Sequence, residues 1–381
     1  MGGRARQPRP GRPAEYTGDG AGTPRFYRPG PAVQGRPHVL VHRGDSTRLT
    51  VGGRSVIGGD VEVMLGGNHR ADWVSTFAIR EVFDLPGAYR DGNPWSKGDV
   101  RLGSDVVIGR GARILSGLTI GDGAVVLPYS VVTRDVSPGQ VVAGHPAAVI
   151  GSRSPAAGPA GPVTPSLAGV RRRAARLLHA AAARIGGEPL PGFPALREPP
   201  SQPQPITMGR ASYFEPVVRA EGDTEVAVEV GPFASISYDT EFLFPDRLAD
   251  PARVAQRAQG GPDAPRGGVR RTVVGGDTWI TRGTRVVVEA TIGAGAVVGA
   301  YSVVYGDVRP YAIVAGNPAV EVGRRFDDET VEALLRIAWW DWPEELVKQR
   351  APELCSSDVA AFVRRYDPAR SGGAGAGGET S

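Results

Sequence analysis

The chain has 381 residues, of which 54 are glycine and 34 are proline, and a formal net charge of +4. This length provides for two domains with tails and a linker, and the glycine and proline content is typical of disorder or of a turn-dense repeat. The single cysteine, Cys355, excludes an internal disulfide framework and a cysteine-based metal site. The charge is only mildly basic, so we expect no nucleic-acid partner, although the arginines suit a phosphate-bearing cofactor. We also expect no metal site.

Neither a membrane span nor a secretion signal is expected. No apolar run reaches about 18 residues, and the basic N-terminal segment has no apolar core. We therefore predict a cytoplasmic protein, which the lone cysteine also favours, with disordered tails at both ends.

Aliphatic residues recur at every sixth position in the middle of the first half of the chain: Leu102, Ile108, Ile114, Ile120, Val126 and Val132. This period fits neither an α-helix nor a long strand. It is typical of a coil of short strands with a turn every sixth residue, in which three hexapeptides make one triangular rung around an apolar core. The fold class predicted is all-β, a left-handed parallel β-helix.

The second half of the chain repeats this pattern at a constant offset, with Val274, Ile280, Val286, Ile292, Val298 and Val304. The segment "TIGDGAVVLPYSVVTRDV" (119–136) matches "TIGAGAVVGAYSVVYGDV" (291–308). The chain therefore contains two β-helices in tandem, which we call the first coil and the second coil.

The remaining segments complete the predicted organisation. A helical pattern with arginines covers 170–185, and "FDDETVEALLRIAWWDWPEEL" (326–346) predicts C-terminal helices packed by tryptophans. The predicted order is a disordered tail over 1–30, the first coil over 31–151, a linker with a short basic helix over 152–205, the second coil over 206–325, C-terminal helices over 326–368 and a disordered tail over 369–381.

The segment "GGNHRADWVSTF" (66–77) interrupts the first coil and is absent from the second. Together with "SVVTRDVSPGQVVAGHPA" and "ALLRIAWWDWP", it resembles the hexapeptide xenobiotic acetyltransferases, which include the streptogramin and hexapeptide-type chloramphenicol acetyltransferases. The resemblance implies acetyl-CoA as donor, a hydroxyl acceptor on a small molecule or carbohydrate, and a homo-oligomer, a trimer with sites between coils. It places the general base at His69, with Asn68, Asp72 and Trp73 at the other motif positions.

The proposed chemistry suits a histidine. A hydroxyl that attacks a thioester carbonyl must lose its proton, and a neutral imidazole accepts it near pH 7 and returns it to the leaving thiolate. Both substrates meet in one cleft, so no covalent enzyme intermediate is needed. We expect Asp72 and Trp73 to shape the loop.

For acetyl-CoA, the resemblance implies a binding stretch on the first coil made by Ser116, Gly117, Thr133, Arg134, Ala143 and Gly144. Arg134, close to the end of the coil, is a candidate for a phosphate contact.

The second coil has no histidine, since none occurs after His179, but it keeps Trp279 where the first coil has Val107. Two interpretations remain open. Either the second coil is only a structural partner, or the site is split, with His69 on one wall and Trp279 on the other. Because a three-sided prism does not accommodate two alternating copies, we expect two homotypic trimers.

The leading hypothesis is an acetyl-CoA-dependent O-acetyltransferase, an acyltransferase acting on a sugar, a polysaccharide precursor or a natural product such as an antibiotic. One alternative is a catalytically inactive hexapeptide-repeat scaffold, because Val107 and the residues after Phe77 depart from the family pattern. Another is N-acetylation of an amino sugar. The acceptor pocket is made by loops, whose sequence does not identify the acceptor.

Overall fold

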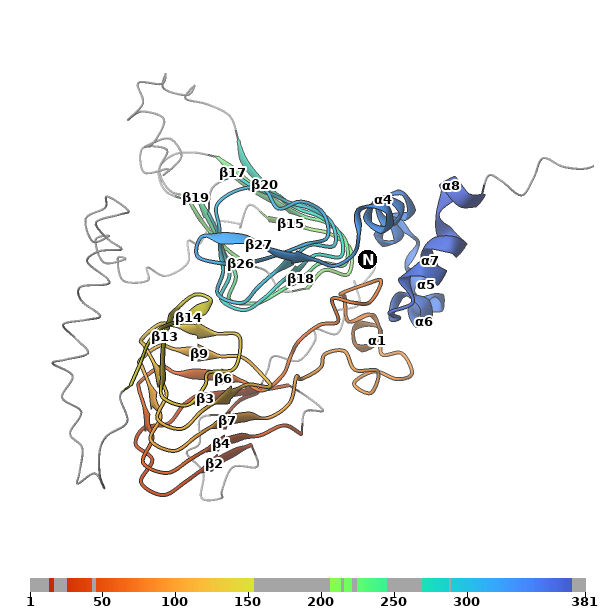
Figure 1. Ribbon diagram of the computed structural model, residues 1–381. Helices are drawn as coiled ribbons and strands as arrows, with labels where there is room; N and C mark the ends of the chain where they lie inside the picture. The colour runs from red at the N-terminus through yellow and green to blue at the C-terminus, as the bar shows by residue number, and fades with distance from the viewer. Residues whose placement is uncertain are drawn as a thin grey trace, which may run out of the picture. The chain divides into compact units, whose positions relative to one another are not determined.

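A computed structural model describes residues 14–16, 26–42, 46–153, 206–213, 216–220, 225–244, 269–287 and 289–371 (Figure 1). The predicted linker helix and most of the two predicted tails lie outside these ranges. The first coil, the second coil and the C-terminal helices belong to one compact unit of the chain.

The first coil consists of short strands in three sheets. One sheet has the order β1 (Ala14–Tyr16), β3 (His38–Val41), β6 (Glu62–Met64), β9 (Arg113–Ile114) and β12 (Val131–Val132). The next has β2 (Tyr27–Pro29), β4 (Leu49–Val51), β7 (Val100–Leu102) and β10 (Thr119–Ile120). The third has β5 (Val56–Ile57), β8 (Val107–Ile108), β11 (Val125–Val126), β13 (Gln140–Gly144) and β14 (Ala147–Ser152). Strands β1 and β2 fall within residues 1–30, which the sequence predicts to be a disordered tail. They are ordered as strands because they pair with β3 and β4.

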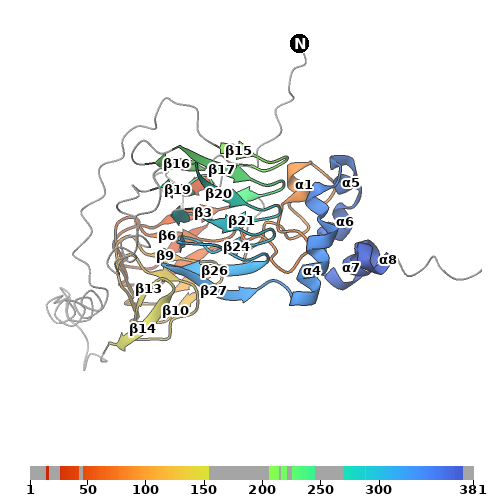
Figure 2. The same cartoon turned by 90° about the horizontal axis from the view of Figure 1, so that it is seen from above.

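The second coil has the same three-sheet construction (Figure 2). Its first sheet contains β15 (Ile206–Met208), β17 (Val226–Val230), β20 (Arg270–Val274) and β23 (Thr291–Ile292). Its second contains β16 (Val217–Ala220), β19 (Glu241–Phe244), β22 (Arg285–Val287) and β25 (Val303–Val304). Its third contains β18 (Ser235–Ile236), β21 (Trp279–Ile280), β24 (Val297–Val298), β26 (Ala312–Gly316) and β27 (Ala319–Arg324).

The six-residue period explains this arrangement. Neighbouring strands are parallel except at the two terminal hairpins and at β1, so equivalent aliphatic residues stack from rung to rung. Ile108, Ile114 and Ile120 are at most 1% exposed in the core of the first coil. The corners need small residues: a Cβ at Gly109 would lie 2.4 Å from the backbone nitrogen of Pro128 in the next rung. The predicted all-β fold of two left-handed parallel β-helices in tandem is confirmed.

The C-terminal region is helical, as expected. It contains α4 (Asp328–Ile337), the 3₁₀ helix η1 (Trp339–Asp341), α5 (Glu344–Gln349), α6 (Ala351–Leu354), α7 (Val359–Tyr366) and α8 (Pro368–Ser371). Asp327 caps α4, since its side chain accepts a hydrogen bond from the N–H of Thr330. Trp339 is fully buried and Trp340 is 8% exposed, so the tryptophans pack the helices, as the sequence predicts.

These helices share a core with the long loop of the first coil. The loop connects β6 to β7 and carries the short helix α1 (Ile79–Val82), which Figure 2 shows beside α5 and α6. Phe77 and Ile79 of the loop are buried in one cluster with Leu334, Trp339 and Val347. The loop is therefore a packed part of the protein, held by residues far away in the chain.

The stacked core gives a first prediction. Replacing Ile120 with alanine removes a fully buried side chain, which typically lowers the free energy of unfolding by about 2–5 kcal/mol. Ile150→Ala, at a position 42% exposed on β14, serves as a matched control and is expected to change it by about 0.5 kcal/mol or less. Urea denaturation of both variants measures these changes. Equal losses of unfolding free energy would contradict the prediction that the repeated aliphatic side chains point into the core.

Candidate active site

The loop that follows β6 is fastened to the first coil at its base. The backbone N–H of Asn68 donates to the carbonyl of Trp95 at 2.9 Å, and the N–H of Trp95 donates back at 2.7 Å. The side-chain amide of Asn68 donates to Oγ of Ser116 at 2.9 Å. Two of the predicted site residues, Asn68 and Ser116, are therefore in direct contact where the loop leaves the coil.

The ring of His69 is oriented by a single backbone bond. Its Nδ1 lies 2.6 Å from the carbonyl oxygen of Thr76. A carbonyl oxygen only accepts hydrogen bonds, so in the neutral ring Nδ1 carries the proton and Nε2 keeps its lone pair. Trp95 adds a further contact, since its indole N–H donates to the carbonyl of His69 at 3.3 Å. This tautomer leaves Nε2 able to accept a proton.

The second coil covers one face of this imidazole. The rings of His69 and Trp279 are stacked with their centroids 4.8 Å apart and their planes 19° apart. Burial lowers the pKa of His69 to about 4, against a smaller opposing effect of the bond to Thr76 and with a contribution from nearby His42. His69 is therefore neutral at pH 7, which is the state that a general base requires.

A buried carboxylate of the second coil holds the segment that orients His69. Asp277 accepts hydrogen bonds from Oγ of Ser75 at 2.8 Å and from the N–H of Thr76 at 2.9 Å. The hydroxyl of Thr76 donates to the backbone carbonyl of Asp277, also at 2.9 Å. Because the carbonyl of Thr76 accepts the hydrogen bond from Nδ1–H of His69, Asp277 fixes the position of the imidazole through Thr76.

The buried guanidinium of Arg325 completes this clamp. It forms an ion pair with Asp277 at 3.0 Å, and the side chains of both residues are fully buried. It also donates to the carbonyls of Ala71, Trp73 and Val74 at 3.0, 2.7 and 3.0 Å. Residues 71–76 of the first coil are thus bound by two charged side chains from the second half of the chain.

The sequence analysis did not identify Asp277 and Arg325 as site residues. A signal was present, because the first coil has the same pair at the equivalent positions, Asp105 and Arg153. That pair forms an ion pair at 3.1 Å, but its side chains are half exposed. An Asp–Arg pair retained in both repeats, at positions outside the aliphatic pattern, was the clue to a docking surface.

Asp72 and Trp73 lie in the loop and interact with Arg70. The exposed carboxylate of Asp72 accepts a hydrogen bond from Nε of Arg70 at 2.7 Å. Trp73 is buried, and the guanidinium of Arg70 lies 5.2 Å from the centre of its ring. Both side chains are placed where they support the loop.

The residues predicted to bind acetyl-CoA fall into two groups. Ser116 and Gly117 follow β9, and Thr133 and Arg134 follow β12 on the next rung, so these four lie at one corner of the first coil below Asn68. Ala143 and Gly144 instead lie in β13, in a different sheet.

The equivalents of that second group in the second coil, Ala315 and Gly316, approach the first coil at His145. Ala315 and Gly316 belong to β26, in the same sheet as Trp279. A Cβ at Gly316 would lie 3.4 Å from the carbonyl oxygen of His145 in the first coil, and the His145 ring is hydrogen-bonded to the backbone of Ala300. The β26 end of the second coil therefore meets the first coil at His145, directly after Gly144.

The two coils of one chain contact each other directly, and the homotypic trimers expected from the sequence stay a prediction. The surface of the first coil that bears the loop is occupied by the second coil of the same chain, through Asp277, Trp279 and Arg325. The sequence pattern describes inward aliphatic residues and does not report which outer faces meet.

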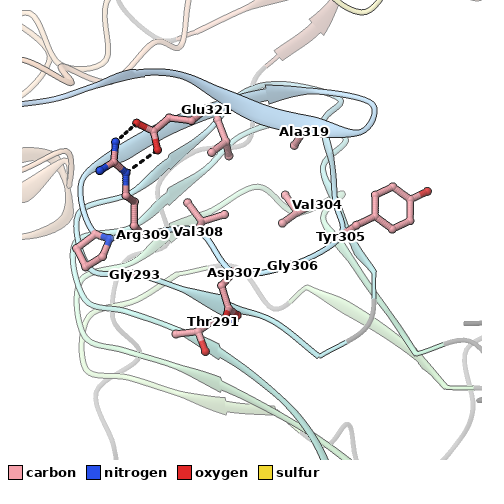
Figure 3. Close-up of a pocket in the computed structure, with 12 residues that line it drawn as sticks. Thr291, Gly293, Val304, Tyr305, Gly306, Asp307, Val308, Arg309, Ala319 and Glu321 are labelled. Carbon is pink, nitrogen blue, oxygen red and sulfur yellow. Dashed lines mark hydrogen bonds and ion pairs between the residues drawn. The ribbon is translucent and has the colours of Figure 1, made fainter. Parts of the chain in front are cut away.

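A separate pocket of 760 Å³ opens on the second coil (Figure 3). Its lining belongs entirely to that coil: Thr291, Gly293, Val304, Tyr305, Gly306, Asp307, Val308, Arg309, Pro310, Val314, Ala319 and Glu321. The guanidinium of Arg309 is joined to Glu321, and Asp307 accepts from the N–H of Thr291 at 2.7 Å. Because the lining includes no histidine and its charged groups are paired, we place the candidate chemistry at His69.

Among the residues described, no helix is long and apolar enough to cross a membrane. Within the same ranges, no three histidine, cysteine, aspartate or glutamate side chains form a group that could hold a metal ion.

Residues 99–134 match the family described as bacterial transferase hexapeptide (six repeats). A chloramphenicol acetyltransferase of Escherichia coli is 46% identical over 95 residues, which make up 25% of this chain and 45% of that protein. A probable macrolide acetyltransferase of Lysinibacillus sphaericus is 43% identical over 74 residues, 19% of this chain and 41% of that protein. A solved maltose O-acetyltransferase from Clostridium difficile 630 has 24% identity and a TM-score of 0.26, over 34% of this chain and 59% of that chain.

The chain spans less than half the length of these curated relatives. The similarity confirms the resemblance to the hexapeptide-repeat acetyltransferases that the sequence motifs indicate.

The clamp gives a second prediction, with its control supplied by the repeat. Asp277→Asn leaves the fully buried charge of Arg325 without its partner, and breaking a buried pair typically costs about 3–5 kcal/mol of unfolding free energy. Asp105→Asn breaks the equivalent exposed pair and is expected to cost about 1 kcal/mol or less. Chemical denaturation of both variants is the measurement. Similar losses at the two positions would show that the loop does not depend on the clamp.

Proposed function

We propose that this chain is an acetyl-CoA-dependent O-acetyltransferase in which His69 is the general base. The observation that carries the proposal is the hydrogen bond from Nδ1 of His69 to the carbonyl of Thr76, because it leaves Nε2 as the proton acceptor in a neutral, buried ring. The matched relatives named as acetyltransferases supply the reaction class.

In the proposed reaction, Nε2 of His69 takes the proton of the acceptor hydroxyl as its oxygen attacks the thioester carbonyl. The positive charge that forms on the ring is stabilised through Nδ1 by the carbonyl of Thr76. When the tetrahedral intermediate collapses, the ring returns the proton to the leaving thiolate of CoA. Nothing becomes attached to the enzyme, since one base serves both proton transfers.

The position of His69 also suggests where the substrates bind. We place the pantetheine arm between the corner of Ser116, Gly117 and Thr133 and the wall of the second coil that carries Trp279. Arg134, exposed at the end of this corner, is suited to a phosphate of acetyl-CoA. Of the predicted cofactor residues, Ala143 and Gly144 lie on another sheet of the first coil and remain candidates for the cofactor, with Gly316 of the second coil close to the adjacent His145.

The matched relatives guide the choice of acceptor. They are named for chloramphenicol and for macrolides, which makes hydroxylated antibiotics the first acceptors to examine, followed by sugars and polysaccharide precursors. Because the chain spans less than half of each of these relatives, the acceptor pocket is not carried over from them.

The test of this function is a thiol-release assay with acetyl-CoA and a panel of hydroxyl and amine acceptors. His69→Ala is expected to lower the rate about 10²–10⁴-fold, because it removes the base. His38→Ala, which alters an exposed histidine on β3, is the control and is expected to keep the activity.

Three outcomes separate the hypotheses. Equal rates for the His69 variant and the unaltered protein would remove His69 from the mechanism. Transfer to amines alone would favour an N-acetyltransferase. The absence of activity with every acceptor would favour the inactive scaffold.

The split site gives a further prediction, again with a control from the repeat. Trp279→Ala removes the ring that stacks on His69, and aromatic pairs contribute about 0.5–1.5 kcal/mol, so kcat/KM is expected to fall about two- to tenfold. Exposure of the imidazole also raises its pKa from about 4 towards its usual value, so the acid limb of kcat/KM moves to higher pH.

Val107→Ala, the equivalent change in the first coil, should leave both the rate and the pH profile unchanged. If the two variants behave alike, the second coil does not form a wall of the site.

A further inference from the structure

A second imidazole of the first coil lies beside the loop that carries His69. His42 directly follows β3, which pairs in parallel with β6, so His42 lies one rung away from Gly66 and Gly67 at the start of the loop. Figure 1 shows β3, β6 and β9 in this order along one sheet. His42 therefore lies at the same corner of the coil as Ser116, which follows β9, but on the opposite side of the loop.

The ring of His42 packs against the backbone of the loop. A Cβ at Gly67 would collide with Nε2 of His42, and Gly67 has a φ of +83°, a conformation that favours glycine. Gly67 is two residues before His69, and two residues of extended chain span at most about 7 Å. The two imidazoles are close enough for His42 to contribute to the lowered pKa of His69. The two rings therefore belong to one small region of the first coil.

His42 has hydrogen-bonding groups that the fold leaves unused. Within the described part of the chain, its ring nitrogens have no hydrogen-bond partner, and its side chain is only partly buried. Burial, with a smaller effect of the guanidinium of Arg282, lowers the pKa of His42 to about 4, so the ring is neutral at pH 7. A neutral imidazole offers one N–H donor and one acceptor nitrogen.

The charges beside His42 are paired, which favours an uncharged ligand. Arg282 of the second coil forms ion pairs with Glu62 at 3.2 Å and with Asp239 at 3.6 Å. A charged acceptor would have to compete with these pairs. A hydroxyl group, which both donates and accepts hydrogen bonds, matches a neutral ring without disturbing them.

We propose that His42 binds a second hydroxyl of the acceptor while His69 takes the proton of the first. Two neutral imidazoles at one corner then select acceptors with two neighbouring hydroxyl groups, as in the diols of sugars. His42 neither gains nor loses a proton, because both proton transfers belong to His69. The inference rests on the proposed function, and it places the acceptor on the His42 side of the loop, opposite the proposed cofactor corner at Ser116.

The experiment compares diol acceptors with the same molecules lacking one hydroxyl. The probes are chloramphenicol and methyl glucoside, each beside analogues in which the hydroxyl that is not acetylated is replaced by hydrogen, in the thiol-release assay with acetyl-CoA. The unaltered protein is expected to use the diol with about three- to tenfold higher kcat/KM, the contribution of one hydrogen bond. His42→Phe keeps a ring against Gly67 but has no polar nitrogen, so it is expected to lower kcat/KM for the diol alone and to abolish the preference.

Two further variants separate binding from a structural role. His42→Gln restores a side-chain donor and acceptor, so it is expected to regain part of the preference. His38→Phe, at an exposed position on the same strand, is the control and is expected to leave the preference unchanged.

The possible results are distinct. A preference for the diol that survives His42→Phe, or equal use of both acceptors by the unaltered protein, would overturn the inference and leave His69 as the base. An equal loss with both acceptors in His42→Phe would also overturn it, because that pattern belongs to a structural role. The absence of transfer to every acceptor would instead overturn the proposed function, and this inference with it.

Discussion

The buried ion pair of Asp277 and Arg325 connects the scaffold of this protein to its chemistry. Two opposite charges that are removed from water stabilise a structure only when their remaining hydrogen-bonding groups are satisfied. Here most of those groups are satisfied by the first coil, through Ser75, Thr76 and the carbonyls of Ala71, Trp73 and Val74. The pair and the loop therefore need each other, and the orientation of His69 follows from that mutual requirement. A coil that has no histidine of its own therefore holds the loop that carries His69.

Duplication allowed the two coils to specialise. Both keep the apolar axis and the aspartate–arginine pair, but only the first keeps the histidine loop and only the second has a tryptophan at the stacking position. A coil with both the histidine loop and the tryptophan could supply either side of such an interface. In this chain the roles are divided, and the histidine of one repeat is covered by the aromatic ring of the other. The difference between Val107 and Trp279 means that only the second coil offers a ring to the imidazole.

The sequence predicts the coil well because its determinants are local and periodic. An aliphatic residue at every sixth position, with small residues at the corners, predicts both the turns of each rung and the side chains that point inward. Ile108, Ile114 and Ile120 are all buried, as this pattern predicts. The motif around His69 predicts a general base at that position. The environment of that base was beyond sequence reasoning, because Thr76, Asp277 and Arg325 come together only when two coils are packed. Their side chains belong to no period, so the sequence pattern does not bring them together.

The separation between the loop and its clamp affects how the protein is made. Ser75 and Asp277 are 202 residues apart, and a chain grows at about 5–20 residues per second, so the loop waits for about 10–40 s before its partner exists. During that time the first coil can close its own apolar axis, because its strands pair with close neighbours in the sequence. Phe77 and Ile79 have no core to enter until the second coil and the C-terminal helices have been synthesised. The nascent first coil is thus a folded body with an unfinished, apolar loop, and the loop around His69 takes its final position only when the polypeptide is nearly complete.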